Sequence, residues 1–87
     1  MTPLDHRPVR LLAFAGARDV IGAPEVEIPV PGACDSAELW SVLLSRFPAL
    51  APYRRSIRLA VNGAYASETD RIAPGDEVAL IPPVAGG

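Results

Sequence analysis

Residues 35–47, DSAELWSVLLSRF, carry a complete set of helix signals. Asp35 is the expected N-cap, and Glu38 three residues later completes a capping box. Apolar residues then recur at helical spacing and form one stripe: Leu39, Trp40, Leu43, Leu44 and Phe47. Pro48 ends the pattern. We therefore expect one amphipathic helix here, with Cys34 packed just before its cap.

Two strands are expected before this helix. Residues 9–15 (VRLLAFA) form an apolar run of strand length. Residues 25–30 (EVEIPV) alternate apolar and polar side chains, and Pro29 favours a position at the edge of a sheet. Between the two strands, Gly16 is expected to end the first strand. One helical turn is then expected over residues 17–21, closed by Gly22.

Three short strands are expected after the helix. Residues 57–61 (IRLAV) and 64–66 (AYA) flank Asn62-Gly63, the preferred pair for a tight hairpin turn. Residues 77–81 (EVALI) follow Pro74-Gly75-Asp76, where proline fixes φ and glycine permits a positive φ.

This order of elements predicts an α+β domain with a mixed sheet of four to five strands and one main helix packed across one face. The most apolar strands, 9–15 and 77–81, are expected in the centre. One helix covers only one face of a sheet. One alternate set from the first strand is therefore expected to lie partly exposed on the other face: either Val9, Leu11 and Ala13, or Leu12 and Phe14. We interpret that exposed face as a docking surface.

Composition narrows the possible functions. A chain of 87 residues forms one small domain. The net charge is −2, so a nucleic-acid partner is not expected. The eight Lys and Arg residues are all arginine, so the protein offers no side-chain amine to which another chain could be attached. No apolar run reaches the ~18–20 residues of a membrane span, so no membrane partner is expected. The single Cys34 favours a reducing, cytoplasmic location.

The usual catalytic and metal-binding constellations are absent from the sequence. With only His6 and Cys34, no metal site of the cysteine and histidine kind is expected. No phosphate-binding loop occurs. Arg54, Arg55 and Arg58 form a small basic cluster that we interpret as a solvated face.

The last residues, 82–87 (PPVAGG), form a tail without a charged or nucleophilic side chain. Two prolines hold its base extended, and Gly86 and Gly87 carry no Cβ that would block an approaching partner. The one reactive group is the terminal carboxylate of Gly87. This anion becomes reactive only when an ATP-dependent partner converts it to an acyl-adenylate, from which a sulfur nucleophile displaces AMP. We therefore divide the chain into a flexible arm (1–8), a domain (9–81) and an extended tail (82–87).

Four motifs mark the later part of the chain: residues 46–48 (RFP), 60–63 (AVNG), 74–79 (PGDEVA) and 81–87 (IPPVAGG). Near the start, a strand ending in Phe14 is followed by Arg18 and Gly22. With these motifs, nearly all of residues 9–87 resembles the small subunit of molybdopterin synthase. The resemblance implies a ubiquitin-like β-grasp fold.

The resemblance also implies a role as a sulfur carrier in molybdenum cofactor biosynthesis, within a heteromer. An adenylyltransferase similar to ubiquitin-activating enzymes would use ATP to adenylate Gly87, and a sulfur donor enzyme would complete the thiocarboxylate. The molybdopterin synthase large subunit would then receive the tail and pass the sulfur to a cyclic pyranopterin phosphate. The carrier would bind no cofactor itself and be non-catalytic alone. The expected partner-binding residues are Pro82, Pro83, Val84, Ala85 and Gly86 of the tail, with Leu12 and Phe14.

Other functions fit the same ending. A sulfur carrier for thiamine or cysteine synthesis would share the Gly-Gly terminus, although the Pro-Pro tail favours the molybdopterin role. A ubiquitin-like protein modifier would instead join its carboxylate to a lysine of another protein. A plain interaction module would leave the tail idle.

Overall fold

The computed structural model describes residues 7–83. Within them it contains five strands, two α-helices and one 3-10 helix. In chain order these are β1 (Val9–Ala13), α1 (Ala15–Ile21), β2 (Glu25–Ile28), α2 (Ser36–Arg46), η1 (Pro48–Tyr53), β3 (Arg58–Val61), β4 (Ala64–Tyr65) and β5 (Glu77–Ile81).

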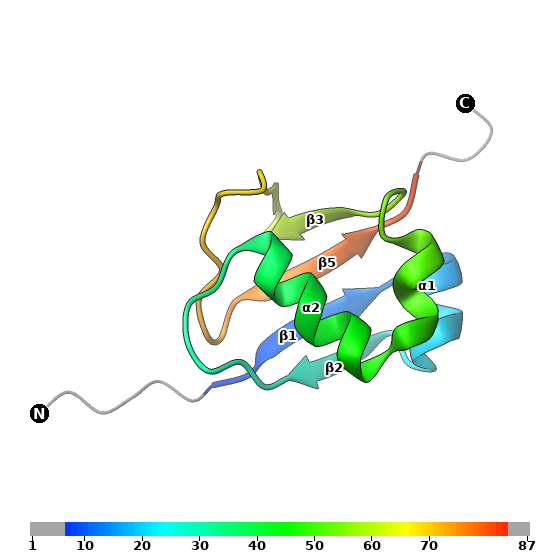
Figure 1. Cartoon of the computed structure of the whole chain (residues 1–87), viewed down its shortest axis with the longest axis horizontal. Coiled ribbons are helices and arrows are strands. Elements are labelled where there is room, and N and C mark those ends of the chain that lie inside the picture. Colours follow the sequence, from blue (N-terminus) through cyan, green and yellow to red (C-terminus); the bar gives the residue numbers. More distant parts are fainter. Residues whose placement is uncertain (1–6, 84–87) are drawn as a thin grey trace, which may run out of the picture.

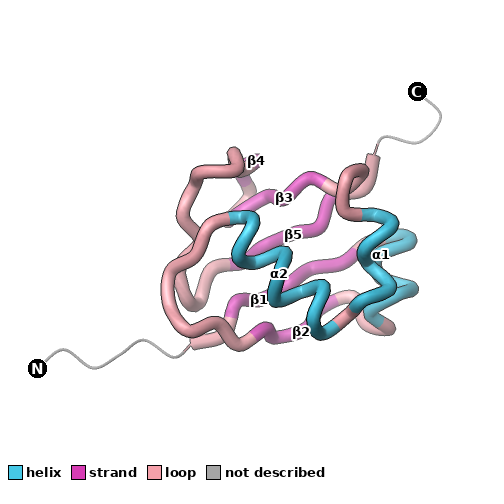
Figure 2. Tube along the Cα trace, in the orientation of Figure 1, coloured by secondary structure: helices cyan, strands magenta, loops and turns pink. Residues whose placement is uncertain are grey.

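The strands form one mixed sheet in the order β2-β1-β5-β3-β4. The two central neighbours β1 and β5 run parallel, and every other adjacent pair is antiparallel. Helix α2 lies across one face of this sheet, whereas α1 and η1 lie together at one end of it (Figures 1 and 2). The predicted fold is confirmed, including the inner positions of β1 and β5 and the edge position of β2.

Helix α2 begins as the sequence predicts. The Asp35 carboxylate accepts a hydrogen bond from the Glu38 backbone N–H at 2.8 Å, and the Glu38 carboxylate accepts one from the Asp35 N–H at 3.3 Å. This reciprocal pair satisfies two backbone donors at the helix start. The predicted stripe then faces the sheet: Leu39, Trp40 and Leu43 are buried, while Leu44 and Phe47 pack partly buried against the same core.

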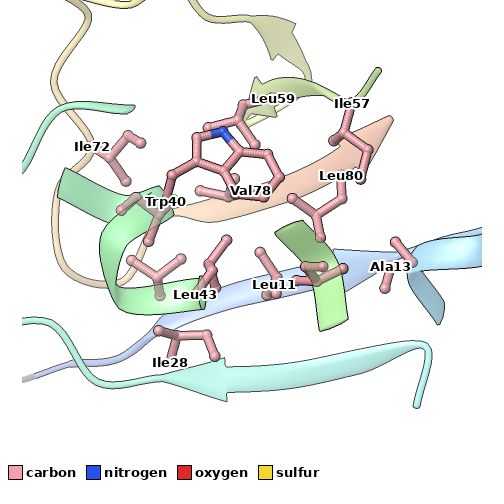
Figure 3. Packing of buried hydrophobic residues seen from close by; sticks show 14 of the residues in the cluster. Leu11, Ala13, Ile28, Trp40, Leu43, Ile57, Leu59, Ile72, Val78 and Leu80 are labelled. Atoms are coloured by element: carbon pink, nitrogen blue, oxygen red, sulfur yellow. The ribbon is translucent and has the colours of Figure 1, made fainter. Parts of the chain in front are cut away.

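The core lies between α2 and the sheet (Figure 3). Leu11 of β1 and Val78 and Leu80 of β5 contribute its central strand side chains, and Trp40 and Leu43 of α2 cover them. The loop residues Cys34 and Ile72 close one side, where their backbones exchange hydrogen bonds of 2.9 and 2.7 Å. Within the described residues no buried polar or charged residue interrupts this core.

Several predicted boundaries were wrong. Gly16 does not end the first strand. Strand β1 stops at Ala13, and Ala15 takes a positive φ of 49°, which turns the chain directly into α1. Helix α1 therefore begins before residue 17 and includes Gly16, although Gly22 closes it as predicted, with φ 85° and its N–H donating to the Arg18 carbonyl at 2.8 Å.

The segment after α2 forms a short helix that was not predicted. Pro48 ends the α-helix but begins η1, because the first helical turn does not require the backbone N–H that proline lacks. Strand β2 ends at Ile28, before Pro29, and is shorter than the alternating sequence suggested.

The hairpin turn is confirmed. Asn62 and Gly63 both take positive φ, 51° and 87°, as a tight turn between twisted antiparallel strands requires. This turn pairs Val61 with Ala64 and Ala60 with Tyr65. The register decides which side chains of β3 and β4 share a face of the sheet.

Candidate partner-binding site

The sheet face opposite α2, here called the outer face, holds an apolar centre. The strand register places Leu12 of β1 beside Ala79 of β5, and Ala79 beside Ala60 of β3. A shallow hollow of about 370 Å³ lies over them. Its lining residues are Leu12, Phe14, Ala60, Gly63, Tyr65, Glu77, Ala79 and Ile81.

The structure decides which alternate set of β1 is exposed. Val9, Leu11 and Ala13 point into the core and are at most 2% exposed. Leu12 is half-buried on the outer face, and Phe14, the residue between β1 and α1, is 46% exposed. The second of the two predicted sets therefore forms the uncovered face. Exposed apolar faces of this kind are typical of interaction sites.

Charged side chains border this apolar centre. Arg10 of β1 lies between two carboxylates on neighbouring strands, donating to Glu77 of β5 and standing 3.6 Å from Glu25 of β2. These side chains are about half exposed, so the ion pairs contribute little to stability. A polar border around an apolar centre is the usual composition of a protein–protein interface.

Strand β5 connects this face directly to the base of the tail. Ile81 lines the hollow, Pro82 follows half-buried, and Pro83 is exposed. The two prolines therefore come directly after a residue of the apolar centre of the outer face. Val84, Ala85, Gly86 and Gly87 lie outside the described residues, and the roles predicted for them stay predictions.

The other reactive groups singled out in the sequence are separate from this face. Cys34 is 5% exposed, and burial is the main cause that raises the pKa of its thiol, followed by the nearby Glu38 and Asp35 carboxylates. His6 lies outside the described residues. Across residues 7–83, no three His, Cys, Asp or Glu side chains gather to hold a metal ion, and no helix is long and apolar enough to cross a membrane.

Sequence reasoning missed part of the hollow. Tyr65, which is 59% exposed, and Ile81 belong to it as much as Leu12 and Phe14 do. Part of the information was present in the sequence, because the Asn62-Gly63 turn fixes the register that pairs Ala60 with Tyr65. Pairing of β3 with β5 then aligns Ala60 with Ala79.

The five-stranded sheet, its crossing helix and the apolar outer face define a ubiquitin-like β-grasp protein. The chain belongs to the ThiS family, whose model matches residues 11–87. Its relatives include the molybdopterin synthase sulfur carrier subunit of Homo sapiens, 37% identical over the whole of both chains. The corresponding subunit of Arabidopsis thaliana is 32% identical, over 91% of this chain and 82% of the relative. The resemblance drawn from the sequence is thereby confirmed.

A solved structure with the same fold is small archaeal modifier protein 1 of Haloferax volcanii. Its TM-score to this chain is 0.76 at 28% sequence identity, over 90% of this chain and 99% of the other. The proteins similar to this chain thus include some named for sulfur transfer and one named as a protein modifier.

Proposed function

We propose that this chain is the sulfur carrier subunit of a molybdopterin synthase. The observation that carries the proposal is the similarity to a sulfur carrier subunit over the whole of both chains, which includes the tail of residues 82–87. The apolar outer face supports it, because the face leads through Ile81 into the base of that tail. A partner bound to this face would lie beside the tail.

The proposed chemistry takes place at Gly87. An adenylyltransferase transfers AMP from ATP to the terminal carboxylate and releases pyrophosphate, and a sulfur nucleophile delivered by a donor enzyme then displaces AMP. The resulting thiocarboxylate supplies sulfur to a cyclic pyranopterin phosphate held by the large subunit. The carrier contributes the acyl group and the docking face, and the partners contribute the catalytic side chains. We place these steps in the cytoplasm.

The direct test is the intact mass of the chain after incubation with ATP, the adenylyltransferase and a sulfur donor. The proposal expects a gain of about 16 Da, for one oxygen replaced by sulfur, located at Gly87 by fragmentation. A chain extended by one alanine beyond Gly87 is the matched control and should stay unmodified, because its reacting carboxylate has moved. Equal modification of both chains would contradict the mechanism.

A second step assigns the pathway. The thiocarboxylated carrier is mixed with the large subunit and cyclic pyranopterin phosphate, and formation of the sulfur-containing pterin is measured. If the thiocarboxylated carrier supplies sulfur only to thiamine or cysteine synthesis, its function is one of those alternatives and not the molybdopterin role.

A role as a protein modifier is the second candidate, supported by the structural similarity to small archaeal modifier protein 1. A modifier's carboxylate would form an isopeptide bond with a lysine of another protein. This chain has no lysine, so one copy cannot form an isopeptide bond to a lysine of another copy. Recovery of Gly87-linked conjugates from cell extract, absent when Gly86 and Gly87 are deleted, would favour this function.

A further inference from the structure

A second and larger hollow lies where the start of α2 meets β3 and the segment that follows η1. Its volume is about 720 Å³. Part of its lining is apolar, from Ala37, Trp40, Ile57, Leu59 and Ala66, and part is basic, from Arg54, Arg55 and Arg58; Ser36 and Glu68 complete it. We call this hollow the basic groove.

The three arginines give the basic groove a net positive charge, because Glu68 is the one carboxylate in its lining. Across residues 7–83, the ion pairs join carboxylates to Arg10 and Arg71, and none involves Arg54, Arg55 or Arg58. Like charges gathered around one hollow repel each other and create a positive potential there. An anionic ligand would relieve that repulsion.

Two of these guanidinium groups are held in place by aromatic rings. Arg54 lies over the Trp40 ring at 5.8 Å, and Arg58 lies over the Tyr65 ring at 4.1 Å. A guanidinium stacked on a ring keeps its N–H donors at the edge free for a carboxylate. Pre-positioned side chains also lose less conformational freedom when a partner binds.

The apolar part of the lining distinguishes between kinds of anion. A free phosphate would contact the arginines but would gain nothing from Ala37 or Ala66. A peptide segment that carries both carboxylates and apolar side chains would use both parts of the groove. The composition of the basic groove therefore favours an acidic, partly apolar peptide.

The basic groove is continuous with the outer face. Arg58 lines the groove and stacks on Tyr65, and Tyr65 also lines the hollow of the outer face. Strands β3 and β4 thus carry one surface that runs from the apolar centre to the arginines. A protein docked on the outer face needs only one segment reaching past Tyr65 to enter the groove.

We propose that the basic groove binds an acidic, partly apolar segment of the same protein partner that docks on the outer face. The inference rests on the proposed function for the identity of that partner. The arginines of the basic groove would speed the encounter with the partner and select partners by charge, while the outer face supplies the apolar contact.

The test compares binding of the molybdopterin synthase large subunit by calorimetry to the full chain and to the double variant Arg54→Gln/Arg55→Gln. Arg58 is left intact because it also contacts Tyr65. The matched control is Arg46→Gln, another exposed arginine stacked on an aromatic ring, 5.5 Å from Phe47 and outside the groove. Circular dichroism and the urea unfolding midpoint establish that each variant is folded.

The proposal expects the double variant to bind about tenfold more weakly, with the difference shrinking as salt is raised, and Arg46→Gln to bind like the original chain. Equal affinity of the double variant and the original chain would overturn the proposal and leave the proposed function standing. A self-associated original chain that the double variant dissociates would assign the groove to a second copy, and would also overturn it.

A second measurement separates this inference from the proposed function, should the large subunit fail to bind the original chain. Trp40 is the only tryptophan, so its fluorescence reports on the groove. A synthetic peptide of alternating glutamate and leucine should give a saturable, salt-sensitive change that the double variant loses. No change with this peptide, or the same change with inorganic phosphate alone, would overturn the proposal.

Discussion

At the scale of single residues, the hairpin turn shows how backbone conformation selects an amino acid. Gly63 has a φ of 87° with open space around its Cα, whereas Gly32 has similar open space without a positive φ. An added methyl group would therefore meet no neighbour at either position. The two glycines differ in conformational demand alone.

We predict that Gly63→Ala lowers the free energy of unfolding by about 1–2 kcal/mol, because a side chain disfavours the left-handed region. The matched substitution Gly32→Ala should leave it unchanged or raise it by up to about 1 kcal/mol, since alanine restricts the unfolded chain. Urea unfolding of the two variants measures both values. Equal destabilisation would show that the positive φ is not the cause.

Cys34 illustrates how burial changes a reactive group into a packing group. Burial, then the Glu38 and Asp35 carboxylates, raise the pKa of its thiol, and Arg71 opposes them. The folded state therefore favours the protonated thiol. This preference contributes stability below the ordinary thiol pKa, and the contribution is lost as the pH rises through the higher pKa of the folded state.

We predict that a disulfide reagent modifies native Cys34 at neutral pH at least about tenfold more slowly than the urea-unfolded chain, since burial and protonation both oppose attack. The native rate should keep rising with pH beyond the ordinary thiol pKa. Absorbance of the released thiolate follows the reaction. Equal rates for the native and unfolded chains would identify Cys34 as accessible and reactive.

At the scale of elements, the start of α2 depends on one reciprocal pair of hydrogen bonds. Asp35→Ala removes the acceptor for the Glu38 N–H, so we expect it to cost about 1 kcal/mol of unfolding free energy. Asp35→Asn should retain most of that stability, since an asparagine side chain can accept the same hydrogen bond. Thermal or urea unfolding gives the values.

The control for this element is Ser41→Ala, which removes only an exposed hydroxyl that donates to the Ala37 carbonyl within the helix. That substitution should change stability by less than about 0.5 kcal/mol. A loss as large as that of Asp35→Ala would mean that helix surface changes in general, rather than the cap, explain the effect.

The elements also show where a local pattern is insufficient. The capping box and the long apolar stripe of α2 are strong enough to fix that helix from sequence. The short helices have weaker local signals: only a turn over residues 17–21 was predicted for α1, and η1, which starts at Pro48, was not predicted. No sequence periodicity is established over such short segments, so packing against the end of the sheet decides them.

At the scale of the whole molecule, the proposed docking role of the outer face can be tested apart from folding. Phe14 and Tyr65 are 46% and 59% exposed, so replacing either with serine should change the unfolding free energy by less than about 1 kcal/mol. Binding of the large subunit should weaken about tenfold or more, because aromatic residues at the centre of an interface carry much of its affinity. Calorimetry measures the affinity and urea unfolding the stability.

Tyr53→Ser is the matched control, because Tyr53 is also an exposed aromatic residue, at 41%, but lies on η1 and does not line the hollow of the outer face. It should bind the large subunit like the original chain. If all three substitutions weakened binding equally, the outer face would not be the docking surface.

The sequence was enough to predict the class of fold, the capped helix α2, the Asn62-Gly63 turn and the family resemblance. Each depends on chemistry local to a few neighbouring residues: a side-chain cap, a helical apolar period, a positive φ or a short motif. The same local information limited the β1 strand to two possible exposed sets.

The choice between those two sets depends on tertiary packing, and so does the assembly of the surfaces. Leu12, Tyr65 and Ile81 meet on one face because strand register and the covering position of α2 bring distant segments together. Arg54 and Arg58 acquire a shared groove in the same way, although the sequence favoured a plain solvated cluster. Which face of a sheet is covered depends on long-range packing, and no pattern within a single strand contains that information.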